Sequence, residues 1–237
     1  MSDEWRVEER TGSAAVLHDA WPAVLERPEG RALAVCHVTE AAVVLGSTQP
    51  ASLVDGARAS ADGVAVARRR SGGGAVLVTP ADPVWVDAWL PAGDPLWTDD
   101  VGRAFDWLGE TWTAALGRSG INGVSAHRQG YVACTRWATS VCFGGVGTGE
   151  VVTADGRKVV GLAQRRNRHG AWFHGACYLH WDPARLVDLL TLSVLEREAA
   201  LVGLGGAAVG VSDLSEQAGQ GPIEGREVAV SVVAALP

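Results

Sequence analysis

Three arginines, a serine and three glycines follow one another in the segment Arg68–Gly74, at the end of the strand-like run Gly63–Ala67. Glycine adopts positive φ angles and lets a backbone approach a ligand closely, so that its N–H groups can point at an anion. Arginine adds a fixed fork of donors that suits phosphate or carboxylate. We interpret the segment as a candidate anion-binding corner. Taken alone, it also fits a hairpin, and it lacks the spacing of a dinucleotide-binding fold or a P-loop.

Lys158 is the second candidate for chemistry. Of the 20 basic residues that are lysine or arginine, 19 are arginine and only this one is lysine. A coding bias explains the abundance of arginine but not the retained lysine. Because an ammonium is compact and flexible whereas a guanidinium is a planar fork, the position is a candidate for a role that needs the ammonium.

The whole chain has 237 residues, 47% of them hydrophobic, and a formal net charge of −7. This length and apolar content predict one domain, residues 1–237. The acidic balance argues against general binding of nucleic acid or of a membrane surface, because both need a broad positive field. The acidic N-terminus does not resemble a secretion signal, and no apolar stretch is long enough to cross a membrane, so we expect a cytoplasmic protein.

The four cysteines are widely separated and form no C-x-x-C pair, which predicts free thiols and no zinc site. No metal ligands are assigned from the sequence.

In the first half of the chain, the apolar spacing predicts a helix over residues 12–27, with a kink or restart at Pro22. The apolar runs 32–38 and 41–46 read as a β-hairpin. A short helix over 51–61 and strands over 63–70, 75–79 and 84–90 follow. Thr98 is the predicted cap of a helix that ends at Gly117 and buries one apolar face.

In the second half, residues 121–149 look loop-rich, and Glu150–Gln164 reads as a hairpin with an Asp-Gly turn. A third strand is predicted over 171–181, and Asp182-Pro183 starts a helix that reaches the high 190s. The stretches 203–210 and 223–237 are ambiguous between helix and strand.

Four segments in this order resemble motifs of the lipoate–protein ligase family, within the wider group of biotin/lipoate ligases and octanoyltransferases. They are Leu45–Gln49, the signature Arg68–Val76, the strand Lys158–Gln164 and the His174-Gly175 pair, and together they cover residues 45–190. Four ordered motifs are far more specific than any one of them. The resemblance implies an α/β (α+β) fold, with a mixed, largely antiparallel sheet flanked by helices, of the biotin/lipoate ligase catalytic-domain type.

The resemblance also implies a reaction. A lipoate or octanoate carboxylate is activated by ATP, with Mg²⁺, to an acyl-adenylate and is then passed to a lysine of a carrier domain. Lys158 is the implied catalytic residue, which stabilises charge on the phosphate and carbonyl oxygens. The implied substrate- and nucleotide-binding residues are Arg69, Arg70, Ser71, Gly72, Gly73, Gly74, Val76, Gly161, Ala163 and His174.

The implied partners are the lipoyl carrier domains of 2-oxoacid dehydrogenase complexes or the glycine-cleavage H protein. The tail after the last motif is too short for the C-terminal accessory domain of many bacterial ligases, so we expect either that this domain is dispensable or that a separate accessory subunit supplies it. Family members often carry a His-Asp pair where this chain has Val78-Thr79. The resemblance therefore does not carry over any contact to magnesium or to the pocket from that pair.

Two alternatives stay open at this point. Cys142-Phe143 sits where one ATP-independent branch, the octanoyltransferases, carries a cysteine that forms an acyl-thioester, and an ammonium nearby would assist such a thiolate. We favour the ligase because all three glycines of the signature are present. The other alternative is a homologue that binds lipoyl groups or carriers without turnover.

Overall fold

The computed structural model of the protein describes residues 4–24 and 30–237. Its main sheet has seven strands in the order β1 (Trp5–Gly12), β2 (Arg31–Val38), β6 (Val84–Pro91), β12 (Gly170–Cys177), β11 (Lys158–Asn167), β10 (Val151–Thr153) and β7 (Val124–Ala126). The β1–β2 pair is parallel and the other pairs are antiparallel. The predicted class, a mixed and largely antiparallel sheet with helices, is confirmed.

A smaller sheet lies beside the main one and has the order β4 (Ala65–Arg68), β3 (Ala42–Leu45) and β5 (Val76–Val78). A two-stranded ladder joins β8 (Val132–Ala133) to β9 (Gly145–Val146). The small sheet matters for the site, because the glycine-rich segment connects β4 to β5 and therefore starts and ends on neighbours of the same central strand.

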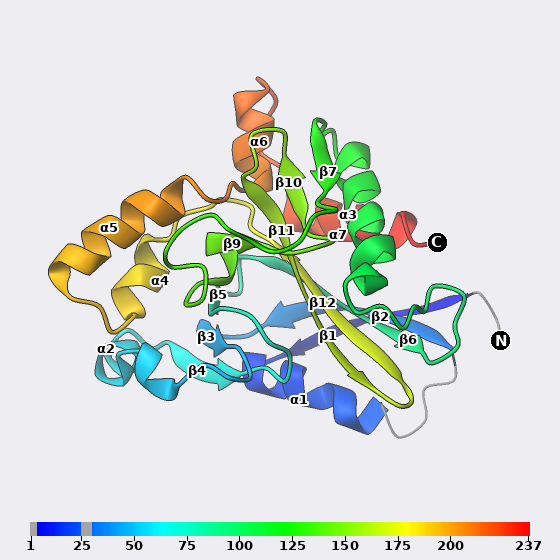
Figure 1. The fold of residues 1–237 in the computed structure, drawn as a ribbon, viewed down its shortest axis with the longest axis horizontal. Helices are drawn as coiled ribbons and strands as arrows, with labels where there is room; N and C mark the ends of the chain where they lie inside the picture. The colour runs from blue at the N-terminus through cyan, green and yellow to red at the C-terminus, as the bar shows by residue number, and fades with distance from the viewer. Residues whose placement is uncertain (1–3, 25–29) are drawn as a thin grey trace.

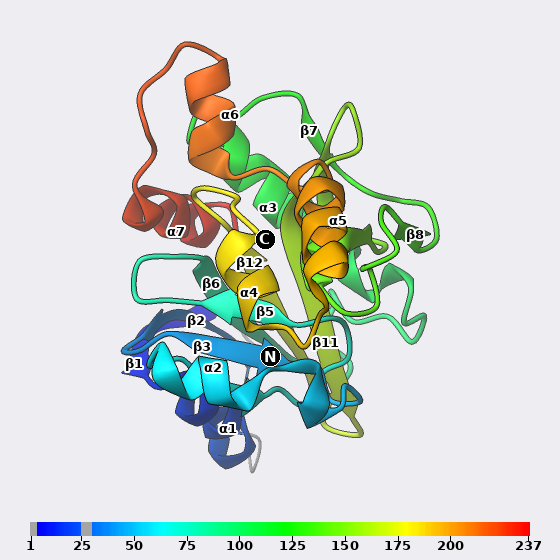
Figure 2. The ribbon, with the colours of Figure 1, turned by 90° about the vertical axis from the view of Figure 1, so that its left-hand side faces the viewer.

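The helices of the described residues are α1 (Ala14–Val24), α2 (Gly56–Ala61), α3 (Asp106–Arg118), α4 (Ala184–Leu189), α5 (Val194–Gly205), α6 (Val211–Gln217) and α7 (Gly225–Ala234). Short 3₁₀ turns are η1 (Ala51–Leu53), η2 (Arg103–Phe105) and η3 (Cys142–Gly144). Figure 1 shows α1 on one side of the long strands and α3 on the other. Apolar side chains of α3 and α7 pack on one face of the main sheet, whereas those of α1 join β3 and the other face. The helices α4 and α5 pack on the small sheet instead (Figure 2).

The hairpin predicted over residues 32–46 is wrong. Strand β2 pairs with β1 and β6, whereas β3 pairs with β4 and β5, so the two apolar runs belong to different sheets. Both runs are almost entirely buried, and a continuous apolar run shows no alternation from which a pairing partner could be inferred. The link at Thr39-Glu40 carries the chain from one sheet to the next.

Two helix boundaries also differ from the predictions. Thr98 caps a turn, since its hydroxyl accepts from the N–H of Asp100, and α3 begins only at Asp106. The predicted helix from residue 184 is two helices, because Ser193 and Glu196 form a capping box that starts α5 anew. Residues 25–27 of the first predicted helix lie outside the described residues.

The remaining elements follow the predictions more closely. The hairpin of β10 and β11 and the third strand β12 form as predicted, and the ambiguous tail contains α7. Residues 121–149 hold the short strands β7, β8 and β9 between turns. Within the described ranges, no helix has both the length and the apolar character that crossing a membrane requires.

Candidate acyl-transfer site

The buried side chain of Arg69 holds the glycine-rich corner in its conformation. The Arg69 guanidinium is buried and donates to three backbone carbonyls, at 2.8 Å to Gly72, 2.8 Å to Gly74 and 3.2 Å to Val44. Burial lowers the pKa of Arg69, and Cys142 opposes this shift. Gly73 has a φ of +98°, and a Cβ on Gly46 would lie 2.0 Å from the Gly73 carbonyl oxygen. The corner is therefore a folded loop held by a guanidinium, with glycine required by close backbone approach.

The same corner holds hydrogen-bond donors without a partner among the described residues. Among the described residues, no acceptor is found for the backbone N–H groups of Gly72, Gly73 and Gly74. The Ser71 hydroxyl is buried and also lacks a partner within the described part of the chain. Successive free N–H groups beside a hydroxyl form a nest suited to an anion. The exposed Arg70 side chain pairs with Asp19 of α1 at 3.4 Å, and its binding role stays a prediction.

Lys158 begins β11, and its side chain is fully buried. Its ammonium Nζ lies 2.7 Å from Glu150 Oε1 and donates to the carbonyls of Cys142 at 2.9 Å and Gly145 at 3.1 Å. Burial lowers the pKa of Lys158, but Cys142 and Glu150 together outweigh it, so the pKa is raised and the group stays charged. Gly161 makes room for it, since a Cβ there would lie 3.2 Å from the Lys158 Cε.

Glu150 is a site residue that the sequence analysis missed. Its second oxygen, Oε2, accepts from the Gly147 N–H at 2.7 Å, and Oε1 accepts from the Leu162 N–H at 2.9 Å. A buried carboxylate with this many donors holds its partner ammonium in one place. The only signal in the sequence is an acidic residue that follows a glycine-rich run and precedes the apolar strand Val151–Thr153.

The Cys142 thiol lies close to the Lys158 ammonium. Its Sγ is 3.7 Å from Lys158 Nζ, and the residue is partly exposed at the start of η3. All four cysteines are free thiols, as predicted.

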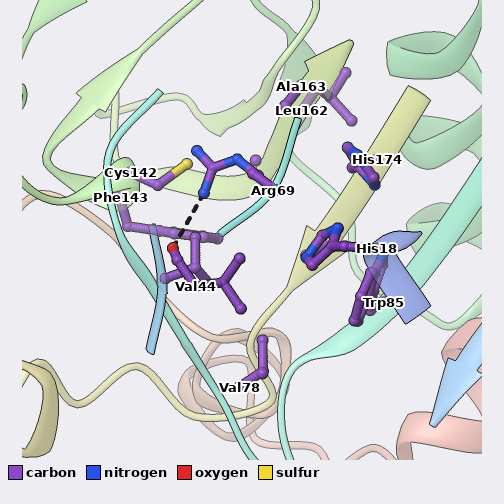
Figure 3. Close-up of a pocket in the computed structure, with 13 residues that line it drawn as sticks. His18, Val44, Arg69, Val78, Trp85, Cys142, Phe143, Leu162, Ala163 and His174 are labelled. Carbon is purple, nitrogen blue, oxygen red and sulfur yellow. Dashed lines mark hydrogen bonds between the residues drawn. The ribbon is translucent and has the colours of Figure 1, made fainter. Parts of the chain in front are cut away.

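A mostly apolar cavity lies beside these groups (Figure 3). Arg69 and Cys142 line it, whereas Lys158, Ser71 and Gly72–Gly74 do not. The cavity has a volume of about 60 Å³. Cys142 and Arg69 lie toward one side in Figure 3, and His174, His18 and Trp85 lie toward the other. Five residues predicted from the sequence to bind substrate line it, namely Arg69, Val76, Gly161, Ala163 and His174. The structure therefore places these five residues and Cys142 around one cavity, while their binding roles stay predictions. We call this space the acyl cavity.

The side of the cavity opposite Cys142 carries a buried polar cluster that the sequence analysis did not find. His174 Nδ1 and Trp85 Nε1 both lie 2.6 Å from Asp87 Oδ1, and the His18 ring packs on Trp85 with centroids 4.5 Å apart. Although burial raises the pKa of Asp87, its hydrogen bonds and the two histidines lower it overall, so the carboxylate is ionised. His174 therefore donates from Nδ1. Burial and the nearby His174 lower the pKa of His18 to about 3, which keeps that ring neutral.

The sequence matches one protein-family model. Residues 22–236 match the lipoyl protein ligase A/B catalytic domain. The chain belongs to this family. No curated protein sequence matches the chain significantly.

Solved structures of lipoate ligases share the fold. A bipartite lipoate protein ligase from the archaeon Thermoplasma acidophilum, described with its E2 lipoyl domain, is 18% identical, with a TM-score of 0.78 over 99% of this chain and 82% of that one. Lipoate-protein ligase A bound with ATP is 18% identical, with a TM-score of 0.71 over 99% and 84% of the two chains. A second T. acidophilum structure, a lipoate protein ligase candidate with bound lipoic acid, has 18% identity and a TM-score of 0.68 over 99% and 84%. At these identities the likeness establishes the fold of this lipoyl ligase family member.

Proposed function

We propose that this family member is a lipoate–protein ligase, which activates lipoate or octanoate with ATP and transfers the acyl group to a lysine of a lipoyl carrier domain. The observation that carries the proposal is the adjacency of three features in one site. These are an acyl cavity, a nest of unpaired N–H groups at Gly72–Gly74, and a charged, buried Lys158. Structures of the same fold support the same assignment, two of them with bound ATP or lipoic acid and one described together with its E2 lipoyl domain.

In the first step, a carboxylate oxygen of the acid attacks the α-phosphorus of ATP, and the bond to pyrophosphate breaks. The N–H groups of Gly72–Gly74 and the Ser71 hydroxyl would hold the phosphate of the resulting acyl-adenylate. Lys158 would stabilise the developing charge. Because its three N–H bonds already meet Glu150, Cys142 and Gly145, one carbonyl contact must be exchanged for the substrate oxygen.

In the second step, the amine of the carrier lysine attacks the acyl carbon, the bond to AMP breaks, and the amine loses a proton. We expect Mg²⁺ to accompany the ATP phosphates rather than to occupy a preformed site. In the described part of the chain, no three His, Cys, Asp or Glu side chains are grouped to hold a metal ion. The proposed carriers are E2 lipoyl domains or the glycine-cleavage H protein, in the cytoplasm, with a separate accessory subunit where one is needed.

The second candidate function is an octanoyltransferase without ATP. It is favoured by the 3.7 Å separation between Cys142 Sγ and Lys158 Nζ at the wall of the acyl cavity. The Cys142 thiolate would attack the carbonyl of an octanoyl thioester and expel the donor thiolate. The carrier lysine would then attack the enzyme thioester and release Cys142. A nearby ammonium stabilises negative charge on the sulfur.

The test offers the protein two acyl donors, either ATP with a free acid or an octanoyl thioester, and compares the variants Lys158→Ala and Cys142→Ser. Ligase activity predicts that ATP, Mg²⁺ and lipoate or octanoate release pyrophosphate, that Lys158→Ala abolishes carrier acylation, and that Cys142→Ser keeps most of it. Cys134→Ser is the matched control, because Cys134 is exposed and lies outside the acyl cavity.

The outcome that rejects the ligase is a folded Cys142→Ser protein that is inactive, together with an octanoyl adduct on Cys142 in the mass spectrum of the parent protein. That result would establish the thioester route. Acylation from neither donor would leave a binding homologue without turnover.

A further inference from the structure

Two side chains form a wall between the acyl cavity and a much larger groove. The groove has a volume of about 1020 Å³ and runs between α7, the strands β1 and β2, and the link from β5 to β6. Trp85 and Val78 line both spaces. The groove is bordered by further apolar side chains, among them Val38, Pro80, Leu179 and Val230. An acyl chain that passed this wall would therefore reach more apolar surface.

Trp85 is the larger part of the wall and is held in place from several sides. Its side chain is 5% exposed, and its Nε1 donates to Asp87 Oδ1 at 2.6 Å. The same carboxylate oxygen binds His174 Nδ1, and the His18 ring packs against the indole. Because Asp87 is itself fully buried in the middle of β6, the indole is fixed to the rigid main sheet.

We propose that Trp85 limits the length of the acyl chain that this protein accepts. The inference rests on the proposed function and adds a specificity residue to it. A tail that enters the acyl cavity ends against the indole, so further methylene groups have no apolar space to occupy. Removing the indole joins the cavity to the groove. Each additional methylene that is then buried tightens binding by about fourfold.

The test measures binding of free acids directly, by calorimetry, and so does not depend on turnover. Hexanoate, octanoate, decanoate, dodecanoate and tetradecanoate are titrated into the parent protein and into Trp85→Leu. For the parent protein we expect affinity to fall by about tenfold or more beyond the acid that fills the cavity. For Trp85→Leu we expect affinity to keep rising with length, by about fourfold per methylene.

Trp89→Leu is the matched control. Trp89 lies on the same strand, is equally buried and lines neither space, so its variant should keep the length profile of the parent protein. Trp85→Phe, which removes less volume, replaces Trp85→Leu if circular dichroism shows that the latter is unfolded. It should move the limit by fewer methylenes.

The results separate the inference from the function on which it rests. If the parent protein binds acids and a folded Trp85 variant keeps the parent length profile, Trp85 does not limit the chain and the proposed function stands. If no acid binds to either protein, both the proposed function and the inference are overturned.

Discussion

Replacing Glu150 with glutamine tests whether this carboxylate holds Lys158 in the site. The change keeps the size of the side chain and removes its charge. Lys158 Nζ then faces only uncharged oxygen acceptors, namely the glutamine amide oxygen and the carbonyls of Cys142 and Gly145, and the whole residue is 1% exposed. Removing one partner of a buried ion pair costs about 3–5 kcal/mol, because the remaining charge is left without compensation. We expect Glu150→Gln to lower the free energy of unfolding by that amount.

The assay is urea denaturation at neutral pH, followed by circular dichroism. Glu110→Gln is the matched control, since the Glu110 side chain is 70% exposed and pairs with Arg128 at the surface. Such a pair contributes less than about 1 kcal/mol. A loss below about 1 kcal/mol for Glu150→Gln would refute the view that Glu150 compensates the buried ammonium.

The pH dependence gives a second readout of the same variant. The pKa of Lys158 is raised above its ordinary 10.5, so its stabilising contribution is complete below that pH and is lost only as the pH rises through the higher folded-state value. Without Glu150 the burial of the ammonium is opposed less. The folded-state pKa of Lys158 is therefore lower in the variant, and we expect the variant to lose less stability than the parent protein as the pH rises above 10.5.

Two further predictions concern the walls of the cavity and the corner. The pKa of His18 is lowered from 6.5 to about 3, so the unfolded chain binds more protons between these values, and stability should fall by up to about 5 kcal/mol as the pH drops through this window. His18→Gln should flatten that dependence in urea titrations, whereas His37→Gln, at a half-exposed histidine, should leave it unchanged. Gly73→Ala should cost about 1–3 kcal/mol in the same assay, because the residue has a φ of +98° and its Cβ would meet Arg69 Nη2 at 2.8 Å. Gly72→Ala, with open space around it, should stay within about 0.5 kcal/mol of the parent protein; equal losses at the two glycines would contradict this account.

The short motifs predicted much of the site because each of them determines the local course of the backbone, which in turn positions the side chains nearby. The glycines of Arg68–Val76 dictate a tight corner between two strands, and the Asp-Gly turn dictates the hairpin whose second strand begins with Lys158. Such features depend on neighbours in the chain, which a sequence displays directly. The pairing of β1 with β2 depends on segments that are not adjacent, and the polar, alternating β1 gave no sign of its partner.

The missed residues have a different physical origin. Asp87 lies within the apolar run Val84–Pro91, and a charged residue in such a run must have buried partners if the run is a central strand. That signal marks Asp87 but does not name His174, which lies on the neighbouring strand 87 positions later. His18 reaches the cluster from a helix whose apolar spacing is unremarkable. Sequence can therefore indicate that a buried charge needs a partner, while only the fold supplies the partner.

The single lysine has a clear explanation in the packing around its side chain. Its ammonium is enclosed by a carboxylate and two carbonyls, and its stem passes close to Gly161, where a Cβ would lie 3.2 Å from the Lys158 Cε. A guanidinium is planar and carries five donors, so it would leave several of them unpaired in this enclosure. The retention of lysine thus follows from the shape of the site before any chemistry is considered. This is why activity in Lys158→Ala must be read beside Glu150→Gln. If Lys158 has only a structural role, both variant proteins lose stability. If Lys158 is catalytic, the Lys158→Ala protein loses acyl transfer even where it stays folded.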